Sequence, residues 1–224
     1  MCGRYTLQQP DSLKKRYNLA TLPDHLRPNY NVAPGQLMPI IVNKSGKPTV
    51  ELMKWGLVPV WAKDIKIGYK LINARGETVF EKPMWRNVIL QKRCLVPADG
   101  FFEWQRGSNP KDKKKPFFIH PKQAGLFSFA GMWEAWKDAE GLEWKTYTII
   151  TTEPNREMSA IHDRMPVILT KKDEAAWLDE ANNSQGKVAV LIRPMADGNL
   201  DMYVVSDEVN SPRNNSPELL QPVT

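Results

Sequence analysis

Residues 93–104 of the chain read RCLVPADGFFEW. Two short apolar runs, Arg93–Val96 and Phe101–Trp104, stand on either side of a Pro-Ala-Asp-Gly cluster. Branched and aromatic residues favour extended backbone, whereas proline, aspartate and glycine favour turns. The segment therefore predicts two β-strands joined by a tight connection. This pattern sets the fold class because it recurs along the chain.

Predicted strands outnumber predicted helices on both sides of this segment. Further strands are expected at Met38–Val42, Val50–Leu57, Phe117–His120, Leu126–Trp136, Tyr147–Thr152, Val167–Thr170, Val188–Ile192 and Met202–Val205. Helices are expected within residues 10–19, at Glu77–Glu81 and Pro83–Leu90 as one helix interrupted at Pro83, at Asn155–Ala160 and at Lys172–Asn182. Because strands and helices do not alternate regularly, a doubly wound parallel sheet is disfavoured. We predict an α+β fold with a largely antiparallel, barrel-like β core and flanking helices, since closing a sheet removes its exposed edges.

The composition is that of an ordinary globular chain. Of 224 residues, 42% are hydrophobic and 25% are charged, and no repeat, low-complexity tract or linker divides them. We therefore expect one domain over residues 1–224. No apolar run approaches the roughly 18 residues that a membrane helix needs, and the N-terminus lacks the apolar segment of a secretory signal. These features predict a cytoplasmic protein without a membrane partner, associated with the nucleoid in a bacterial host.

The charge balance permits nucleic-acid binding without requiring it. Lysines and arginines number 31 against 25 aspartates and glutamates, which gives a net charge of +6. Many proteins with such an excess bind no nucleic acid. The densest basic run, Lys111–Lys115, follows a Gly-Ser-Asn-Pro stretch that predicts a hairpin tip. A solvated loop explains this run as well as a phosphate contact does.

The chain has two cysteines, Cys2 and Cys94. A disulfide framework needs more, and neither cysteine lies in a Cys/His cluster with zinc spacing, so no metal site is expected. Cys94 lies in the strand-like run Arg93–Val96 and is interpreted as a small buried hydrophobe. Cys2 differs because removal of the initiator Met1, which aminopeptidases carry out when the second residue is small, makes it the N-terminal residue.

An N-terminal Cys2 carries an amine and a thiol on adjacent carbons. Their ordinary pKa values, about 8 and about 8.5, leave useful fractions of neutral amine and thiolate near neutral pH. The amine condenses with an aldehyde to a Schiff base, and the thiol then closes on the same carbon to give a thiazolidine. The second step is intramolecular and gains a large effective concentration. The alternative is that Cys2 simply belongs to a frayed terminus.

Three polar residues elsewhere have side chains suited to catalysis. His162, followed by Asp163 and Arg164, can titrate near neutral pH, or these residues form a purely structural turn. Glu103 stands among aromatic residues, where desolvation raises a carboxyl pKa and suits the group to acid–base work, or it occupies the polar face of a strand. Asn73 follows an apolar run and either orients a substrate oxygen or caps a helix.

Several segments together resemble the SOS-response-associated peptidase family, the abasic-site shielding proteins. They are Met1–Tyr5, Tyr30–Gly35, Lys54–Trp61, Ile72–Thr78, Arg93–Trp104, Ile161–Pro166 and Val209–Pro212. One such segment is weak, but the ordered set, anchored by a cysteine at position two, is highly specific and covers essentially the whole chain. The resemblance implies a pseudo-barrel with helices on its flanks and a positive groove for single-stranded DNA.

The resemblance also assigns residues to roles. The catalytic cysteine, asparagine, glutamate and histidine of the family match Cys2, Asn73, Glu103 and His162. Phosphate contacts are implied for Arg4, Arg75 and Arg164, and contacts to bases or a strand junction for Asn31, Pro34, Trp61 and Trp104. Core packing explains each tryptophan as well. We expect a monomer without a cofactor, whose partner is single-stranded DNA with abasic sites, including junctions with double-stranded DNA.

The implied activity is a covalent crosslink formed in the DNA damage response. Once Met1 is removed, Cys2 captures the ring-opened aldehyde of an abasic site and shields the lesion. His162 assists ring opening, Glu103 manages protons and helps reverse the crosslink, and Asn73 holds the terminal residue and the sugar oxygen in line. Two alternatives stay open: an N-terminal-cysteine peptidase or amidohydrolase that processes itself at Met1, and a non-covalent DNA-binding module that needs neither Cys2 nor Glu103.

Overall fold

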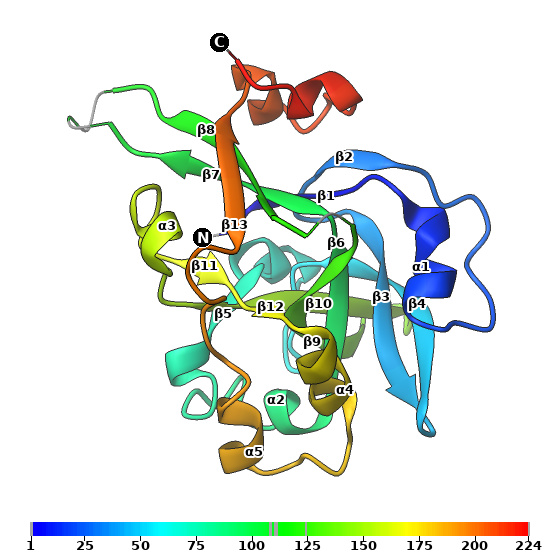
Figure 1. Ribbon diagram of the computed structural model, residues 1–224. Helices are drawn as coiled ribbons and strands as arrows, with labels where there is room; N and C mark the ends of the chain where they lie inside the picture. Colours follow the sequence, from blue (N-terminus) through cyan, green and yellow to red (C-terminus); the bar gives the residue numbers. More distant parts are fainter. Residues whose placement is uncertain (1, 108, 110–111, 124, 224) are drawn as a thin grey trace.

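A computed structural model of the chain describes residues 2–107, 109, 112–123 and 125–223 (Figure 1). Its strands are β1 Arg4–Leu7, β2 Asn29–Val32, β3 Leu37–Lys44, β4 Lys47–Trp55, β5 Asn73–Arg75, β6 Arg93–Ala98, β7 Gly100–Gln105, β8 Lys115–Pro121, β9 Phe127–Lys137, β10 Glu143–Thr152, β11 Met165–Pro166, β12 Ile168–Leu169 and β13 Leu200–Val204. Its α-helices are α1 Leu13–Arg16, α2 Val88–Gln91, α3 Arg156–Ser159, α4 Lys171–Leu178 and α5 Gln185–Ala189. Short 3-10 helices lie at Pro10–Ser12, Ile65–Lys70, Gly76–Thr78, Asp207–Asn210 and Pro217–Leu220. Within the described ranges, no helix has the length and apolarity to cross a membrane.

A ring of strands closes into a barrel at the centre of the molecule. The pairing path runs from β10 through β4, β3 and β6 to β9, and β9 pairs back with β10. These pairs are antiparallel except that β10 runs parallel to β4, and β10 also runs parallel to β5 outside the ring. The closed ring with its flanking helices confirms the predicted α+β fold and barrel-like core.

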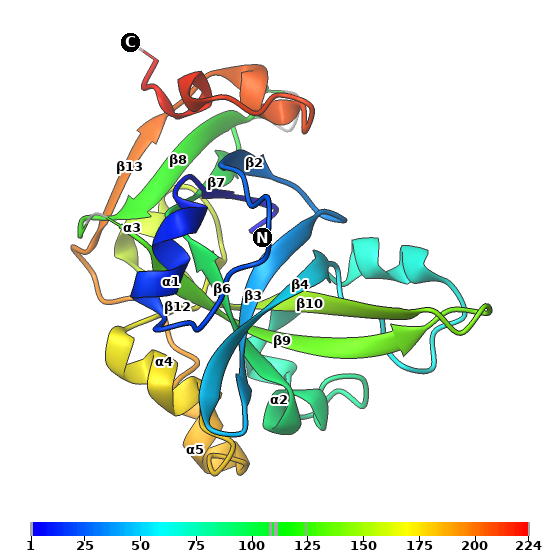
Figure 2. The same ribbon diagram turned by 90° about the vertical axis from the view of Figure 1, so that its right-hand side faces the viewer.

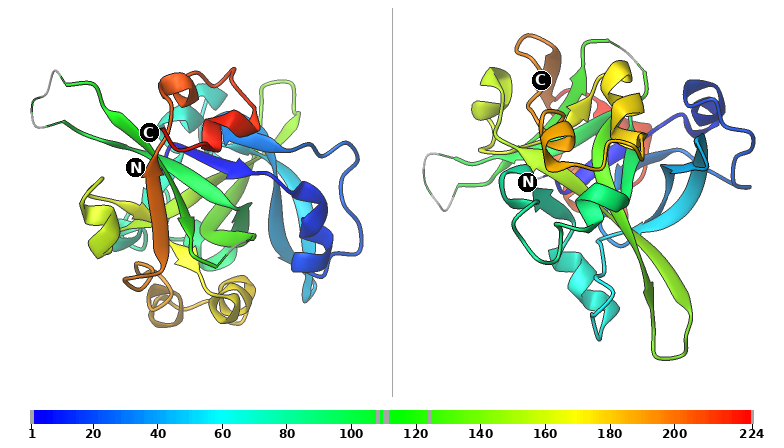
Figure 3. Two further views of the ribbon diagram at one scale, coloured as in Figure 1. Left: turned by 45° about the horizontal axis from the view of Figure 1, so that its top comes forward. Right: turned by 90° about the horizontal axis from the view of Figure 1, so that it is seen from below.

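A second, antiparallel sheet lies beside the barrel in the order β13, β8, β7, β1, β2. This order places β1, which follows Cys2, between β2 and β7. Figure 2 shows the β9–β10 hairpin extending from the body, and Figure 3 shows the β7–β8 hairpin projecting in another direction. The predicted tip at Lys111–Lys115 falls between β7 and β8, but Lys111 itself is outside the described residues.

Segment 93–104 is the corner where the chain passes from one sheet to the other. β6 belongs to the barrel and β7 to the second sheet, with Asp99 between them, so both predicted strands are confirmed. The Asp99 carboxylate accepts hydrogen bonds from the backbone N–H (2.5 Å) and the side-chain amide (2.9 Å) of Gln8. At Gly100 a Cβ atom would lie 2.2 Å from the Phe118 ring, so the corner requires glycine.

The helices lie outside the sheets, and Figure 3 shows α2, α4 and α5 gathered at one end of the barrel. The helix predicted at Asn155–Ala160 is confirmed as α3. The strand predicted at Val188–Ile192 is wrong, because the chain forms α5 there. Val188 and Leu191 are buried whereas Val190 is exposed. A spacing of three residues between buried positions fits a helical face and not the alternation of a strand.

Two other predicted helices are shorter than expected. The predicted helix interrupted at Pro83 forms only the 3-10 turn Gly76–Thr78 and α2, with successive turns between them. Pro83 supplies no N–H donor, which favours those turns over a continuous helix. The predicted helix Lys172–Asn182 ends at Leu178, because Asp179 adopts an extended conformation.

Arg93 accounts for where α2 and α4 end. Its buried guanidinium donates hydrogen bonds to the carbonyl oxygens of Ile89 (3.0 Å), Leu90 (2.9 Å), Trp177 (2.6 Å) and Asp179 (2.8 Å). Carbonyl groups in the last turn of a helix have no partner within that helix, so one cation here satisfies both ends. The first residue of β6 thus attaches two helices to the barrel.

Two glycines anchor the segment that leads from β4 to β5. A Cβ atom on Gly56, whose φ is +115°, would lie 2.5 Å from the carbonyl oxygen of Gly68, and a Cβ atom on Gly68 would lie 2.5 Å from that of Gly56. The Gly56 N–H also donates to the carbonyl oxygen of Tyr147 at 2.8 Å. This close backbone contact sets the path of the chain toward Asn73, the first residue of β5.

Asn31 ties the second sheet to the C-terminal segment. Its side chain is fully enclosed, and Nδ2 lies within hydrogen-bond distance of the carbonyl oxygens of Val209 (3.2 Å), Ser211 (3.0 Å) and Asn214 (3.0 Å). Its Oδ1 accepts a hydrogen bond from Arg4 at 2.8 Å, and Arg4 also donates to the Val209 carbonyl at 2.7 Å. One buried amide therefore serves several carbonyl groups of the C-terminal segment.

Replacing Asn31 by Ala is expected to lower the free energy of unfolding by about 2–3 kcal/mol, because buried carbonyl groups and the Arg4 guanidinium lose their partner. Urea denaturation followed by tryptophan fluorescence measures this change. Asn87→Ala is the matched control, since Asn87 is exposed and its side chain makes no capping hydrogen bond. Equal free energies for the two variants would show that the Asn31 contacts contribute nothing.

Candidate active site

Cys2 and Asn73 meet through a hydrogen bond between segments distant in sequence. Cys2 precedes β1 and is fully buried, and its carbonyl oxygen accepts a hydrogen bond from Asn73 Nδ2 at 2.8 Å. Asn73 is held in place because β5 pairs with β10, with Asn73 opposite Ile149. The alternative role of Asn73 as a helix cap is excluded by this position in a strand. Asn73 Oδ1 is a buried acceptor that has no hydrogen-bond partner within the described part of the chain.

Glu103 reaches the same region from β7. β7 pairs with β1 in antiparallel register, with Phe102 opposite Arg4, so the end of β7 that carries Glu103 lies beside Cys2. Glu103 is 2% exposed, and this burial raises the pKa of its carboxyl group. Burial and the nearby Glu103 also raise the pKa of the Cys2 thiol well above its usual value. The thiol is therefore protonated at neutral pH.

His162 lies in the loop between α3 and β11 and is half-buried. Its Nδ1 is 3.0 Å from the backbone N of Arg164 and 2.8 Å from Oδ1 of Asp163. The two contacts favour opposite protonation states, because Nδ1 accepts from an N–H only in the neutral ring and donates to a carboxylate only when it carries a proton. We assign the neutral ring with its proton on Nε2, since the Asp163 side chain is 84% exposed and water satisfies it.

The four predicted catalytic residues thus come together from separate elements. Asn73 touches Cys2 directly, Glu103 acts electrostatically on Cys2, and His162 acts electrostatically on Glu103. A cavity of about 480 Å³ opens beside His162, between the end of β7 and the loop after α3. Among the residues that the structure describes, no group of three His, Cys, Asp or Glu side chains is placed to hold a metal ion.

Arg164 joins the loop of His162 to the segment of Asn73. Its guanidinium donates to both carboxylate oxygens of Glu77, at 2.6 and 2.9 Å, and to the carbonyl oxygen of Thr151 at 2.7 Å. Sequence reasoning assigned Arg164 to phosphate binding and missed Glu77 and Thr151. The acidic residue just after the Asn73 segment was the available signal, but one sequence cannot show which distant arginine it meets.

Arg4, Asn31 and Trp104 also make contacts inside the protein. Arg4 and Asn31 hold the C-terminal segment as described above, and the Trp104 Nε1–H donates to Oδ1 of Asn210 at 2.7 Å. A DNA contact by any of the three would have to compete with these bonds or use another part of the side chain. Trp104 also lines a cavity of about 500 Å³ with Lys113 and other residues.

Arg75, Trp61 and Pro34 are the predicted DNA contacts that remain accessible. Arg75 is exposed two residues after Asn73, and no hydrogen bond or ion pair links its side chain to another described residue. Trp61 is 61% exposed, which is unusual for a large aromatic side chain. Pro34 is half-buried in the turn between β2 and β3. Arg75 therefore offers an accessible basic group close to Asn73 in the chain, and Trp61 offers an accessible aromatic surface.

Comparison with known proteins gives consistent matches over the chain. The family described as SOS response associated peptidase (SRAP) matches residues 1–212. Abasic site processing protein YoqW of Bacillus subtilis (strain 168) is 47% identical over 224 residues, with 99% of each chain covered. Abasic site processing protein HMCES of Gallus gallus is 36% identical over 251 residues, which cover 96% of this chain and 70% of that protein. A crystal structure of a protein from Bacteroides thetaiotaomicron has a TM-score of 0.89 at 31% identity, with 100% of both chains covered. The chain belongs to the SOS response associated peptidase (SRAP) family.

Proposed function

We propose that this protein processes abasic sites by bonding Cys2 covalently to the ring-opened aldehyde of the lesion in single-stranded DNA. The observation that carries the proposal is the setting of Cys2, whose carbonyl oxygen Asn73 holds at 2.8 Å and whose thiol lies in the field of the buried Glu103 carboxyl group. Relatives named abasic site processing proteins match nearly the whole chain and support the same activity.

The reaction needs the amine and the thiol of Cys2 together. Hydrolysis of the Met1–Cys2 peptide bond first frees the amine. The amine nitrogen then adds to the aldehyde carbon, and loss of one water gives a Schiff base. The thiol sulfur adds to the same carbon while its proton passes to the nitrogen, which closes the thiazolidine without any change of oxidation state. Reversal of these steps returns the aldehyde.

The neighbouring groups can move the protons that these steps require. Burial raises the pKa of the Glu103 carboxyl group, which makes it a better base, so Glu103 takes a proton from the incoming amine and returns it when water leaves. The neutral ring of His162 transfers a proton at the sugar hydroxyl during ring opening. The buried Oδ1 of Asn73 accepts a hydrogen bond from the substrate while Nδ2 keeps the Cys2 backbone in place.

The rival peptidase activity would require a different state of the thiol. Attack on an amide by a cysteine uses the thiolate, and peptidases lower the thiol pKa to obtain it. Burial and Glu103 raise the pKa of Cys2 instead. A neutral thiol fits the proposed order, in which the amine attacks first and the thiol adds afterwards to an activated carbon.

Cys2→Ala is expected to abolish crosslinking, because it removes the sulfur that closes the thiazolidine. The assay incubates the protein with a labelled single-stranded oligonucleotide carrying one abasic site and resolves the products on a denaturing gel. Cys94→Ala is the matched control, because Cys94 is the other buried cysteine and should leave the crosslink intact. Equal bands from wild type and Cys2→Ala would overturn the proposal.

The requirement for the amine is tested by inserting a glutamate between Met1 and Cys2, which blocks removal of Met1 and leaves the thiol in the chain. This variant should form no crosslink, and intact mass spectrometry should show that Met1 is retained. If it crosslinks as wild type does, the thiazolidine chemistry is wrong, although a thiol-dependent adduct would survive.

Glu103→Gln should slow crosslinking by about a hundredfold or more and yet remove a pH-dependent loss of stability. Because the pKa of Glu103 is higher in the folded chain, the folded state binds more protons between the two pKa values, and stability falls as pH rises through that interval. Wild type should therefore lose more stability than the variant as pH rises above about 4, the ordinary pKa of a glutamate, measured by thermal unfolding. Other titrating groups are common to both proteins and cancel in the difference. If the difference in stability between wild type and Glu103→Gln does not change with pH, this role of Glu103 is contradicted.

Arg75→Gln should weaken non-covalent binding of single-stranded DNA and reduce the slope of log K against log salt by about 0.7, the value for one lost phosphate contact. Fluorescence anisotropy of a labelled oligonucleotide without a lesion measures both quantities. Arg27→Gln is the control, because Arg27 is also exposed but lies in the loop before β2. Identical salt slopes for the two variants would place Arg75 outside the DNA contact.

A further inference from the structure

A groove of about 1110 Å³ lies away from the predicted catalytic residues, none of which lines it. It is bounded by α4, by the start of β9 and by the segment between α5 and β13. It is larger than the cavities of about 480 and 500 Å³ beside His162 and Trp104. The proposed crosslinking reaction gives this groove no role.

The lining of the groove includes many apolar side chains. Leu126, Pro194 and Met195 are partly exposed, and below them lies a floor of side chains that are each 4–7% exposed, Phe127, Ile168, Leu169 and Leu191. Ile168 and Leu169 form β12, which stands at the end of its sheet path and pairs with β9 among the described strands. An extended chain can lie alongside such a terminal strand and place alternate side chains in an apolar groove. The lining therefore suits an extended peptide with a large apolar side chain.

The rim of the groove is basic. Lys171 and Lys172 are exposed, and no hydrogen bond or ion pair links them to other described residues. Arg193 also lines the groove, and its Nη2 donates to the Asp173 carboxylate at 2.7 Å, so the one acidic group in the lining is already neutralised. The groove thus presents two uncompensated positive charges beside an apolar surface.

Lys171 and Lys172 lie at the end of a helix where positive charge is unfavourable. They are the first two residues of α4, whose N-cap is Thr170. The N-terminal end of a helix carries partial positive charge, so cations there are unfavourable. Residues that break a local rule without a compensating contact often serve a function. Asp173 and Glu174 lie in the same first turn but are paired with Arg193 and Arg16, so a bound carboxylate would compensate the two lysines.

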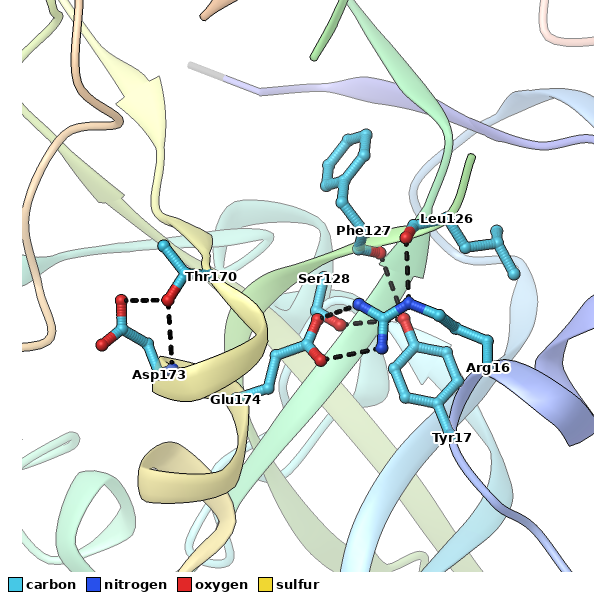
Figure 4. Close-up of polar contacts among 8 residues, drawn as sticks. All are labelled: Arg16, Tyr17, Leu126, Phe127, Ser128, Thr170, Asp173 and Glu174. Carbon is cyan, nitrogen blue, oxygen red and sulfur yellow. Dashed lines mark hydrogen bonds and ion pairs between the residues drawn. The ribbon is translucent and has the colours of Figure 1, made fainter. Parts of the chain in front are cut away.

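The wall next to the lysines is rigid. Arg16 donates to both carboxylate oxygens of Glu174, at 2.9 and 2.6 Å, and through Nε to the carbonyl oxygen of Leu126 at 3.0 Å. The Tyr17 hydroxyl donates to the carbonyl oxygen of Phe127 at 3.1 Å. Figure 4 shows these contacts joining α1, the start of β9 and α4. A peptide would meet a preformed surface and would not have to order it.

We propose that this groove binds an acidic peptide segment of a partner protein, with carboxylates on Lys171 and Lys172 and a large apolar side chain between β12 and Met195. Nucleic acid is the less suitable occupant. Phe127 is the aromatic residue of the described lining, and it is only 7% exposed, so no ring face is offered for base stacking. Charge complementarity and an aliphatic floor instead match carboxylates next to an apolar anchor.

The test selects random peptides displayed on phage against the full-length wild-type chain and removes those that also bind a Lys171→Glu/Lys172→Glu variant. Peptides with several acidic residues beside a large apolar residue should be enriched. In fluorescence anisotropy, a synthetic peptide from this pool should bind the double variant at least about tenfold more weakly, which corresponds to about 1.4 kcal/mol. Replacing its apolar residue by alanine should weaken binding to a similar extent.

Lys113→Glu/Lys114→Glu is the matched control, since it changes the net charge equally at two adjacent exposed lysines outside the groove. Its affinity for the peptide should stay within about twofold of wild type, because exposed charges beyond a Debye length are screened. Thermal unfolding of both variants checks that each is folded.

Two outcomes would overturn the proposal. In the first, no enriched peptide depends on Lys171 and Lys172, or the enriched sequences lack acidic residues. In the second, an undamaged single-stranded oligonucleotide displaces the peptide. That oligonucleotide also binds the Lys171→Glu/Lys172→Glu variant more weakly than it binds wild type, while its affinity for the control variant is unchanged. The groove would then be part of a DNA-binding surface. Crosslinking to abasic DNA is measured in parallel and tests the proposed function separately.

Discussion

β1 is held against β7 by the antiparallel pairs Arg4–Phe102, Tyr5–Phe101 and Thr6–Gly100. Extended backward by one residue, this register places Gly3 opposite Glu103, and Cys2 directly precedes Gly3. Successive side chains of a strand point to opposite faces, so a slip of one residue would turn every side chain of β1 to the other face. The approach of the thiol to the carboxyl group therefore depends on the register of one short pair of strands.

Several contacts at both ends of β1 stabilise that register. Tyr5 is fully buried, and its hydroxyl lies 2.8 Å from the hydroxyl of Tyr147 in the barrel. Arg4 is fixed by the buried amide of Asn31, and Gln8 is fixed by Asp99 at the corner between the sheets. Each of these partners comes from a different element, so the C-terminal segment, the barrel and the corner all contribute to the position of Cys2.

The sequence predicted most of the strands correctly and the helices less well. Short runs such as Phe101–Trp104 carry their own signal, because aromatic residues between turn residues favour extended backbone. Val188–Ile192 is also rich in branched apolar residues, yet it runs from the end of α5 into a turn, with Val188 and Leu191 buried and Val190 exposed. Arg4 and Arg164 read as phosphate ligands because an isolated arginine in a sequence has no visible partner. Their partners lie from 13 to 206 residues away along the chain, and no short sequence motif marks them.

The centre formed by Cys2, Glu103 and His162 holds protons in place of charges. Burial raises the pKa of both the thiol and the carboxyl group, and each group disfavours ionisation of the other, because two buried negative charges repel. Ionising either buried group costs folding free energy, so these groups make stability fall as pH rises. The arrangement also keeps a proton donor next to the carbon where a hydroxyl group must leave as water. The same desolvation that weakens the fold thus provides the acid that the proposed condensation requires, and the Glu77–Arg164 ion pair keeps the segments of Asn73 and His162 together around it.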